Sequence, residues 1–139
     1  MNRDQKYILI FLLLFMSFGG YQFIKLSSVR AYRYVNNSKT EVDSLPDGSY
    51  KGSFKPFNLI KLATVEFTIK ERKIKRFEIS RLFLTPWKEV RPSIQDSIKK
   101  NSSLKFNAVS GATRSSFYVK AAILNATDQP KNTLNPIEK

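Results

Sequence analysis

A short stretch near the C-terminal end of the chain holds the residues best suited to bind an anion. It reads Asn-Ala-Val-Ser-Gly-Ala-Thr-Arg-Ser-Ser over residues 107–116, and a helical run follows it to about Ala126. Gly111 permits a positive φ angle, and Ala112 adds almost no bulk. A phosphate group there would meet unpaired N–H groups and the positive end of the helix dipole. The stretch therefore indicates an anion site, although an ordinary loop with a helix cap uses the same residue types.

The same stretch resembles a flavin-attachment motif. It is similar to the flavinylation motif of the FMN-binding domain family, whose domain also occurs in subunits of Rnf electron-transport complexes and of the sodium-pumping NADH:quinone oxidoreductase. In that family the last Thr of Ser-Gly-Ala-Thr carries FMN through a phosphoester bond, which a dedicated flavin transferase installs from FAD. The resemblance gives this role to Thr113.

The resemblance extends to an earlier motif. Asp-Gly-Ser-Tyr-Lys-Gly at residues 47–52 is similar to the family's opening strand, Asp-Gly-x-Tyr-x-Gly, and the resemblance covers about residues 46 to 126. The family usually has Asp at the position of Asn107. The resemblance thus implies FMN that is covalent on Thr113, or non-covalent if Asn107 prevents flavinylation.

The expected flavin site follows from this resemblance. Ser110 and the free N–H groups of the helix start would hold the phosphate, and Arg114 would neutralise its charge. The flavin ring needs a flat apolar surface, for which Trp87 and Phe106 are our choices. The complete expected cofactor site is Asn107, Ser110, Gly111, Ala112, Thr113, Arg114, Ser115, Trp87 and Phe106.

The composition restricts other chemistries. The 139 residues include no Cys and no His, which excludes thiol nucleophiles, disulfides, Ser-His-Asp triads and the usual zinc sites. We expect no catalytic residue and no metal ligand in the site. Redox chemistry would have to come from a bound cofactor.

The net charge of +13 is concentrated in one part of the chain. Residues 47–126 hold sixteen basic and six acidic side chains, whereas the tail from Thr127 is neutral. Such a domain attracts polyanions, in principle nucleic acid, anionic lipid headgroups or acidic cell-wall polymers, and a solvated basic surface without a dedicated partner is the alternative. For a membrane flavoprotein, we expect no nucleic-acid partner.

An apolar run near the N-terminus predicts a transmembrane helix. It covers residues 7–24, between Lys6 and Lys25, and as a helix it would extend about 27 Å, close to the hydrocarbon thickness of a bilayer. A signal peptide shares the basic start and the apolar middle, but no small-x-small cleavage pattern follows the run. We therefore expect an uncleaved anchor at residues 1–25, contacting the membrane through residues 7–24.

The charges on either side of the apolar run and the family resemblance predict opposite sides of the membrane for the domain. More basic residues follow the run than precede it, and the positive-inside rule alone would keep the C-terminal domain in the cytoplasm. Domains of the resembled family usually work on the outer face. We follow the resemblance and expect a single-pass membrane protein with its domain on the extracytoplasmic side.

The remaining pattern predicts an α+β domain, a small antiparallel sheet packed with two helices. Residues 26–46 would be a juxtamembrane segment and linker, 47–126 the FMN-binding domain and 127–139 a disordered tail. The predicted strands are Ser49–Phe54, Leu62–Lys70 and Ile74–Leu84, the last with Phe77, Ile79 and Phe83 on one face. The predicted helices run from Glu89 or Val90 to Lys100, with Val90, Ile94 and Ile98 stacked, and from Thr113 or Arg114 to Ala126, with Phe117, Ala121 and Leu124 on one face.

Three functional interpretations remain open at this point. The first is an electron carrier with FMN on Thr113, served by a flavin transferase and a membrane redox partner. The second is a flavin-free, basic binding module of the same fold that binds anionic cell-surface polymers. The third is an accessory subunit whose anchor assembles with other membrane proteins.

Overall fold

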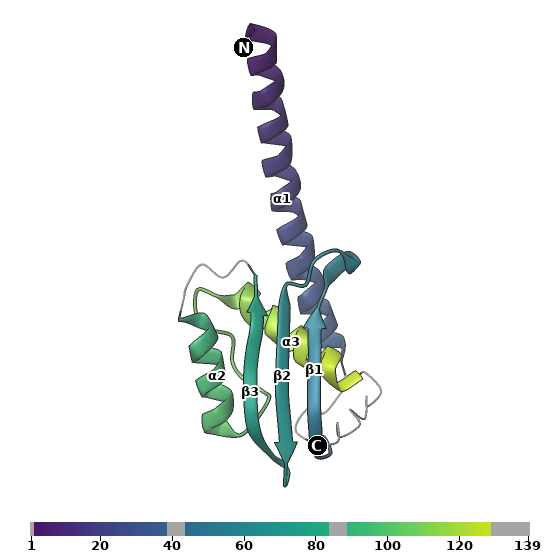
Figure 1. The fold of residues 1–139 in the computed structure, drawn as a ribbon, viewed down its shortest axis with the longest axis vertical. Helices are drawn as coiled ribbons and strands as arrows, with labels where there is room; N and C mark the ends of the chain where they lie inside the picture. The colour runs from purple at the N-terminus through teal and green to yellow at the C-terminus, as the bar shows by residue number, and fades with distance from the viewer. Residues whose placement is uncertain (1, 39–43, 84–88, 129–139) are drawn as a thin grey trace, which may run out of the picture.

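The computed structural model describes residues 2–38, 44–83 and 89–128 and confirms the α+β class. Its elements are α1 (Arg3–Asn37), β1 (Gly48–Phe54), the short 3-10 helix η2 (Pro56–Asn58), β2 (Ala63–Lys70), β3 (Lys73–Leu82), α2 (Val90–Asn101) and α3 (Thr113–Asp128). The strands form an antiparallel sheet in the order β1-β2-β3. Helix α3 covers β1 and β2, α2 packs on β3, and α1 packs on α3, with its N-terminal part projecting away from the domain (Figure 1).

The third strand departs from its predicted pattern at one end. Phe77 and Ile79 are buried as predicted, but Phe83 follows β3 and is 46% exposed. The reason is a bulge, since Val65 pairs with Ile79 whereas Thr64 pairs with Arg81. The extra residue in β3 reverses the alternation of faces, so the predicted placement of Phe83 on the core face was wrong. Leu84, the predicted last residue of this strand, lies outside the described residues.

The turn between β2 and β3 is stabilised from a distant part of the chain. Glu71 and Arg72 have φ angles of 56° and 57°, the pair of positive values typical of a type I′ turn, although neither residue favours them. The side-chain oxygens of Asp47 accept the backbone N–H groups of Glu71 at 2.9 Å and of Arg72 at 3.2 Å. These hydrogen bonds hold the pKa of the Asp47 carboxyl below its usual range. The carboxylate thus fixes a turn that has no Gly or Asn of its own.

The rest of the 47–52 motif also has structural roles. The Tyr50 ring stacks on Phe67 at 5.1 Å between centroids, and its hydroxyl donates to the carbonyl oxygen of Pro46 at 2.7 Å. Gly52 lies directly under α3, where an added Cβ atom would be 2.2 Å from the carbonyl oxygen of Ala122. The motif therefore joins β1 to the hairpin turn on one side and to α3 on the other.

Helix α1 is long and apolar enough to span a membrane, and none of its most apolar stretch is buried in the domain. The helix continues without interruption to Asn37. Ser27 and Ala31 are fully buried, and Tyr34 donates its hydroxyl to Asp128 at 2.7 Å. Residues 26–37, predicted as part of a juxtamembrane segment and linker, thus belong to a helix that packs on the domain.

The two domain helices have the predicted core faces, with one addition. In α2, Val90, Ile94 and Ile98 are buried. In α3, Ala121 and Leu124 are buried and Phe117 is half-buried. Helix α3 contacts both the sheet and α1, so residues outside the predicted core face are buried as well. These are Tyr118, Val119, Ala122, Ile123 and Ala126. Of the predicted tail 127–139, Thr127 and Asp128 complete α3, and the rest lies outside the described residues.

Candidate functional site

The motif at 107–116 forms a turn that leads directly into α3. The backbone N–H of Ala112 donates to the carbonyl oxygen of Val109 at 2.9 Å, and Gly111 has a φ angle of 77°. A positive φ at the third turn position is what a type II turn requires, and Gly adopts it without steric cost. Gly111 is therefore needed for the chain to enter the helix at this angle.

Ser116 fixes the turn from inside the helix. Its Oγ accepts the backbone N–H of Val109 at 2.9 Å and donates to the carbonyl oxygen of Ala112 at 3.0 Å. The side chain is fully buried, so these bonds form away from competing water. The sequence places Ser116 in the motif but does not assign it this role.

The helix start presents exposed polar groups. Ala112 accepts the first backbone bond of α3, from the N–H of Ser116 at 3.0 Å, which makes Thr113 the first helical residue. The N–H groups of Thr113, Arg114 and Ser115 therefore have no intrahelical acceptor. Thr113, Arg114 and Ser110 are exposed. An anion at this end would meet donor groups, a hydroxyl and a guanidinium together.

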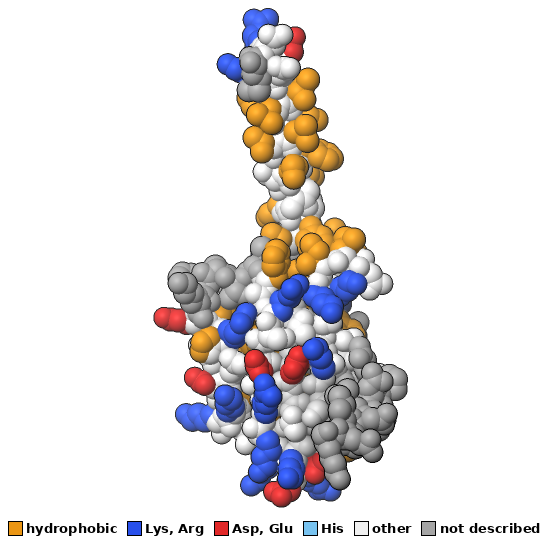
Figure 2. Space-filling view, viewed as in Figure 1, with side chains coloured by type: hydrophobic (Ala, Val, Ile, Leu, Met, Phe, Trp, Pro, Cys, Tyr) orange, Lys and Arg blue, Asp and Glu red, His pale blue; other side chains and the backbone are white. Residues whose placement is uncertain are grey.

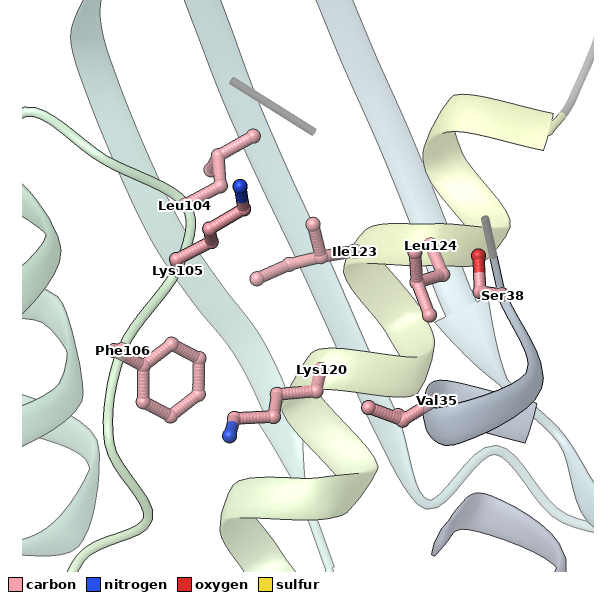
Figure 3. A pocket seen from close by; sticks show the side chains of 8 residues that line it. All are labelled: Val35, Ser38, Leu104, Lys105, Phe106, Lys120, Ile123 and Leu124. Atoms are coloured by element: carbon pink, nitrogen blue, oxygen red, sulfur yellow. The ribbon is translucent and has the colours of Figure 1, made fainter. Parts of the chain in front are cut away.

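A hollow of about 190 Å³ lies beside the same helix (Figure 3). The loop before the motif bounds it on one side, α3 on another, and the C-terminal end of α1 on a third. The residues that line it are Val35, Ser38, Leu104, Lys105, Phe106, Lys120, Ile123 and Leu124. Its lining is mainly apolar, and two lysines, Lys105 and Lys120, contribute to it.

Lys120 is one of the two lysines that line this hollow. Its Nζ lies 5.3 Å from the centroid of the Phe106 ring and 5.1 Å from that of Phe117, close enough for cation–π contacts. Burial lowers the pKa of the Lys120 ammonium. The residue stands seven positions after Thr113, which is about two helical turns and about 10 Å along the axis. Thr113, Phe117 and Lys120 therefore share one face of α3.

The residues expected from the sequence divide into three groups in the structure. Those exposed around the helix start are Asn107, Ser110, Gly111, Thr113 and Arg114. Those that are buried are Ala112, Ser115 and Phe106, of which Phe106 also lines the hollow. Trp87 lies outside the described residues. The structure thus brings the phosphate-binding candidates together at one helix end and places Phe106 on the wall of the neighbouring hollow.

Sequence reasoning missed the residues of the hollow other than Phe106. Lys120 carries a signal that could have identified it, because its spacing of seven from Thr113 places both on one helix face. Val35 and Ser38 carry no such signal, since α1 reaches the hollow only through tertiary packing.

In the described part of the chain, no cluster of three or more His, Cys, Asp or Glu side chains is arranged to hold a metal ion. Comparison with protein-family models, with curated proteins and with solved structures found no match.

Proposed function

We propose that the chain is a membrane-anchored, extracytoplasmic flavoprotein that carries electrons through FMN attached by a phosphoester to Thr113. One observation carries this proposal. The Thr of the flavinylation-like motif is the exposed first residue of a 16-residue helix, directly after a turn that Gly111 makes with a φ angle of 77°. A modifying enzyme can reach a hydroxyl in such a position.

The residues at the helix start fit a phosphate ester. An ester on the Thr113 Oγ1 would lie among N–H groups that lack intrahelical acceptors, at the positive end of the α3 dipole. Arg114 supplies a guanidinium at the next position, and Ser110 an exposed hydroxyl in the preceding turn. Asn107 is exposed three positions before Ser110 and carries no charge of its own.

The hollow fits part of a flavin ring. Its volume of about 190 Å³ is smaller than the roughly 300 Å³ at which ligand pockets usually begin, so it would receive one edge of the ring system. Phe106 would supply an aromatic wall for the ring, and Lys120, about 10 Å from Thr113 along the same face of α3, would place a positive charge beside it. FMN would supply uptake and release of one or two electrons, chemistry that no side chain of this chain offers.

Lys120 would tune such a cofactor. A positive charge near a flavin ring favours its negatively charged reduced form and raises the reduction potential. Because burial lowers the pKa of this ammonium, the free protein holds it at a desolvation cost that a nearby anionic ring would offset.

The proposed partners follow from the attachment and the anchor. A flavin transferase would install FMN, and a membrane redox partner would exchange electrons with it. Helix α1 is long and apolar enough to hold the domain at a membrane. The extracytoplasmic side is part of the proposal and rests on the family resemblance of the motif at 107–116.

Substitution of the attachment residue tests the proposal. The full chain and its Thr113→Val variant would be co-expressed with a flavin transferase, routed to the compartment where that enzyme works, and examined by in-gel flavin fluorescence and peptide mass. We expect the peptide holding Thr113 to gain the mass of FMN minus water and the variant to gain nothing. Thr68→Val, the same exchange on the half-exposed side of β2, is the matched control and should keep the flavin.

Two results would count against the proposal. Flavin fluorescence that remains on denatured Thr113→Val would place the attachment elsewhere. An unmodified chain that also binds no free FMN would remove the electron-transfer function, and the basic charge of the domain would then favour the polymer-binding alternative.

A further inference from the structure

The connection between β1 and β2 exposes large apolar side chains. Phe57 is 43% exposed, Leu59 68% and Ile60 45%. Phe57 and Asn58 both have a φ angle of 56°, a left-handed conformation that non-glycine residues rarely adopt. The chain thus accepts backbone strain in a segment that turns apolar groups outward. We refer to residues 55–61 as the 55–61 loop.

This loop lies against α1 at the end of the apolar run. The centroid of the Phe57 ring lies 6.1 Å from the centroid of the Phe23 ring, and the guanidinium carbon of Arg30 lies 4.8 Å from the Phe57 centroid. Phe23 belongs to the apolar run, and Arg30 stands about 10 Å farther along the helix axis. That distance is of the order of the headgroup layer of one leaflet, about 5–8 Å. If the run spans the hydrocarbon, the loop is at the membrane surface.

Basic side chains surround these apolar groups. Lys55 and Lys61 flank the loop, and Lys25 and Arg30 are exposed on α1. The ion pairs in the described residues lie on the sheet and its turn, between Lys51 and Glu66, Lys75 and Glu71, and Arg76 and Glu78. The sequence has no acidic residue from 5 to 40 or from 48 to 65. These four cations therefore have no acidic neighbour in sequence.

The apolar and basic groups form one continuous surface. Figure 2 shows apolar side chains gathered where the projecting helix meets the domain, with Lys and Arg side chains directly beside them. Leu26 and Val29, which stand on α1 between Phe23 and Arg30, add exposed apolar area, at 54% and 43%. An apolar face with a basic border is the composition that binds an anionic bilayer surface.

We propose that the 55–61 loop, together with Leu26, Val29, Lys25 and Arg30, docks on an anionic lipid bilayer. Phe57, Leu59 and Ile60 enter the interfacial layer, and the four basic groups contact headgroup phosphates. A lipid surface is favoured over a protein partner because the surface is continuous with the span of α1. The inference rests on the membrane anchorage of the proposed function and is independent of the flavin.

The absence of Cys from the sequence permits a direct test by site-specific labelling. Single-cysteine variants of the full chain would carry an environment-sensitive fluorophore in vesicles of phosphatidylcholine with a minority of phosphatidylglycerol. Leu59→Cys reports on the loop and Leu14→Cys on the anchor. Lys73→Cys, at the opposite end of the sheet from the loop, is the matched exposed control (Figure 1).

We expect blue-shifted emission and quenching by spin-labelled lipid at positions 59 and 14, and neither at position 73. Adding Lys55→Ser and Lys61→Ser to the Leu59→Cys variant should lower the docked-to-free ratio about five-fold for each charge removed. Vesicles of phosphatidylcholine alone should weaken docking in the same way, without changing the signal from position 14.

Three results would overturn the inference, and each has a different meaning. An aqueous signal at position 59 with a hydrocarbon signal at position 14 would leave the anchor intact and remove the docking. Aqueous signals at both positions would remove the anchorage itself. A label at position 59 that is shielded from water but not quenched by lipid would assign the surface to a second copy of the chain.

Discussion

The packing of α3 on β1 depends on the absence of one side chain. In a Gly52→Ala variant the new Cβ would lie 2.2 Å from the carbonyl oxygen of Ala122 and 2.4 Å from the backbone nitrogen of Ala126, whereas real Cβ contacts are essentially never under 3.0 Å. Both neighbours are backbone atoms of a regular helix, so no side-chain rotation relieves the contact. Helix α3, whose buried face packs on β1, would therefore have to move away from that strand.

The cost can be estimated from the two opposing effects. Overpacking of a well-packed core usually costs about 1–3 kcal/mol, and rigid backbone neighbours favour the upper end of that range. Ala is more favourable than Gly inside a strand by roughly 0.5–1 kcal/mol, which offsets part of the cost. We therefore expect a loss of about 2 kcal/mol in the free energy of unfolding, which for a domain of this size lowers Tm by about 10 °C.

Thermal unfolding of the full chain in detergent micelles, followed by far-UV circular dichroism, measures this effect. Ser53→Ala, at the next position of β1, is the matched control and should stay within about 0.5 kcal/mol of the wild type. Adding Ala126→Gly to the Gly52→Ala variant removes only the contact with the Ala126 Cβ at 2.6 Å, so it should not restore stability. An unchanged Tm for Gly52→Ala, or full rescue by the second substitution, would refute the close approach of α3.

Further predictions concern the hydrogen bonds that shape the hairpin turn and the helix start. Because the pKa of Asp47 is lowered on folding, its contribution to stability is present above the unfolded pKa of about 3.9 and is lost as the pH falls through the folded value. The difference in Tm between the wild type and Asp47→Asn should therefore be largest near neutral pH and vanish in acid. A difference that does not change with pH would mean that the Asp47 carboxylate does not stabilise the turn. Ser116→Ala should lower the free energy of unfolding by about 1–3 kcal/mol because the Val109 N–H loses its acceptor, and it should reduce flavin attachment, whereas Ser93→Ala, at an exposed position of α2, should keep both. Equal loss in the two serine variants, measured by thermal unfolding and in-gel fluorescence, would mean that Ser116 does not hold the turn.

The regular elements could be predicted because their signals are local. Alternation of Val65, Phe67 and Ile69 identifies β2, and the spacing of Ile94 and Ile98 identifies the core face of α2. The predicted placement of Phe83 was wrong because no local signal marks a bulge, which depends on pairing with β2. The stabilisation of the β2–β3 turn was equally hidden, since its hydrogen-bond acceptor stands 24 positions before Glu71.

The candidate site could likewise be predicted where its signals are local, and not where it depends on tertiary packing. Gly111 and the hydroxyl residues around it identify a helix start from adjacent positions alone, and the structure has the helix begin at Thr113. The hollow brings together α1, α3 and the loop before the motif, and its formation depends on the packing of α1 on α3. Phe106 was chosen for its aromatic ring, but its contact with Lys120 follows only from the fold.

The continuity of α1 bears on how the proposed electron carrier would work. The helix has 35 residues and is about 52 Å long, of which a span of 18 residues accounts for about 27 Å. The part of the helix that follows the span packs on α3, where the centroid of the Tyr32 ring lies 5.2 Å from that of Phe117, one turn after Thr113. The helix thus packs directly on the domain, and the docking proposed for the 55–61 loop would add a second fixed point. A flavin on Thr113 would then stay at a set height above the bilayer, which favours electron exchange with a partner held in the same membrane over exchange by a swinging domain.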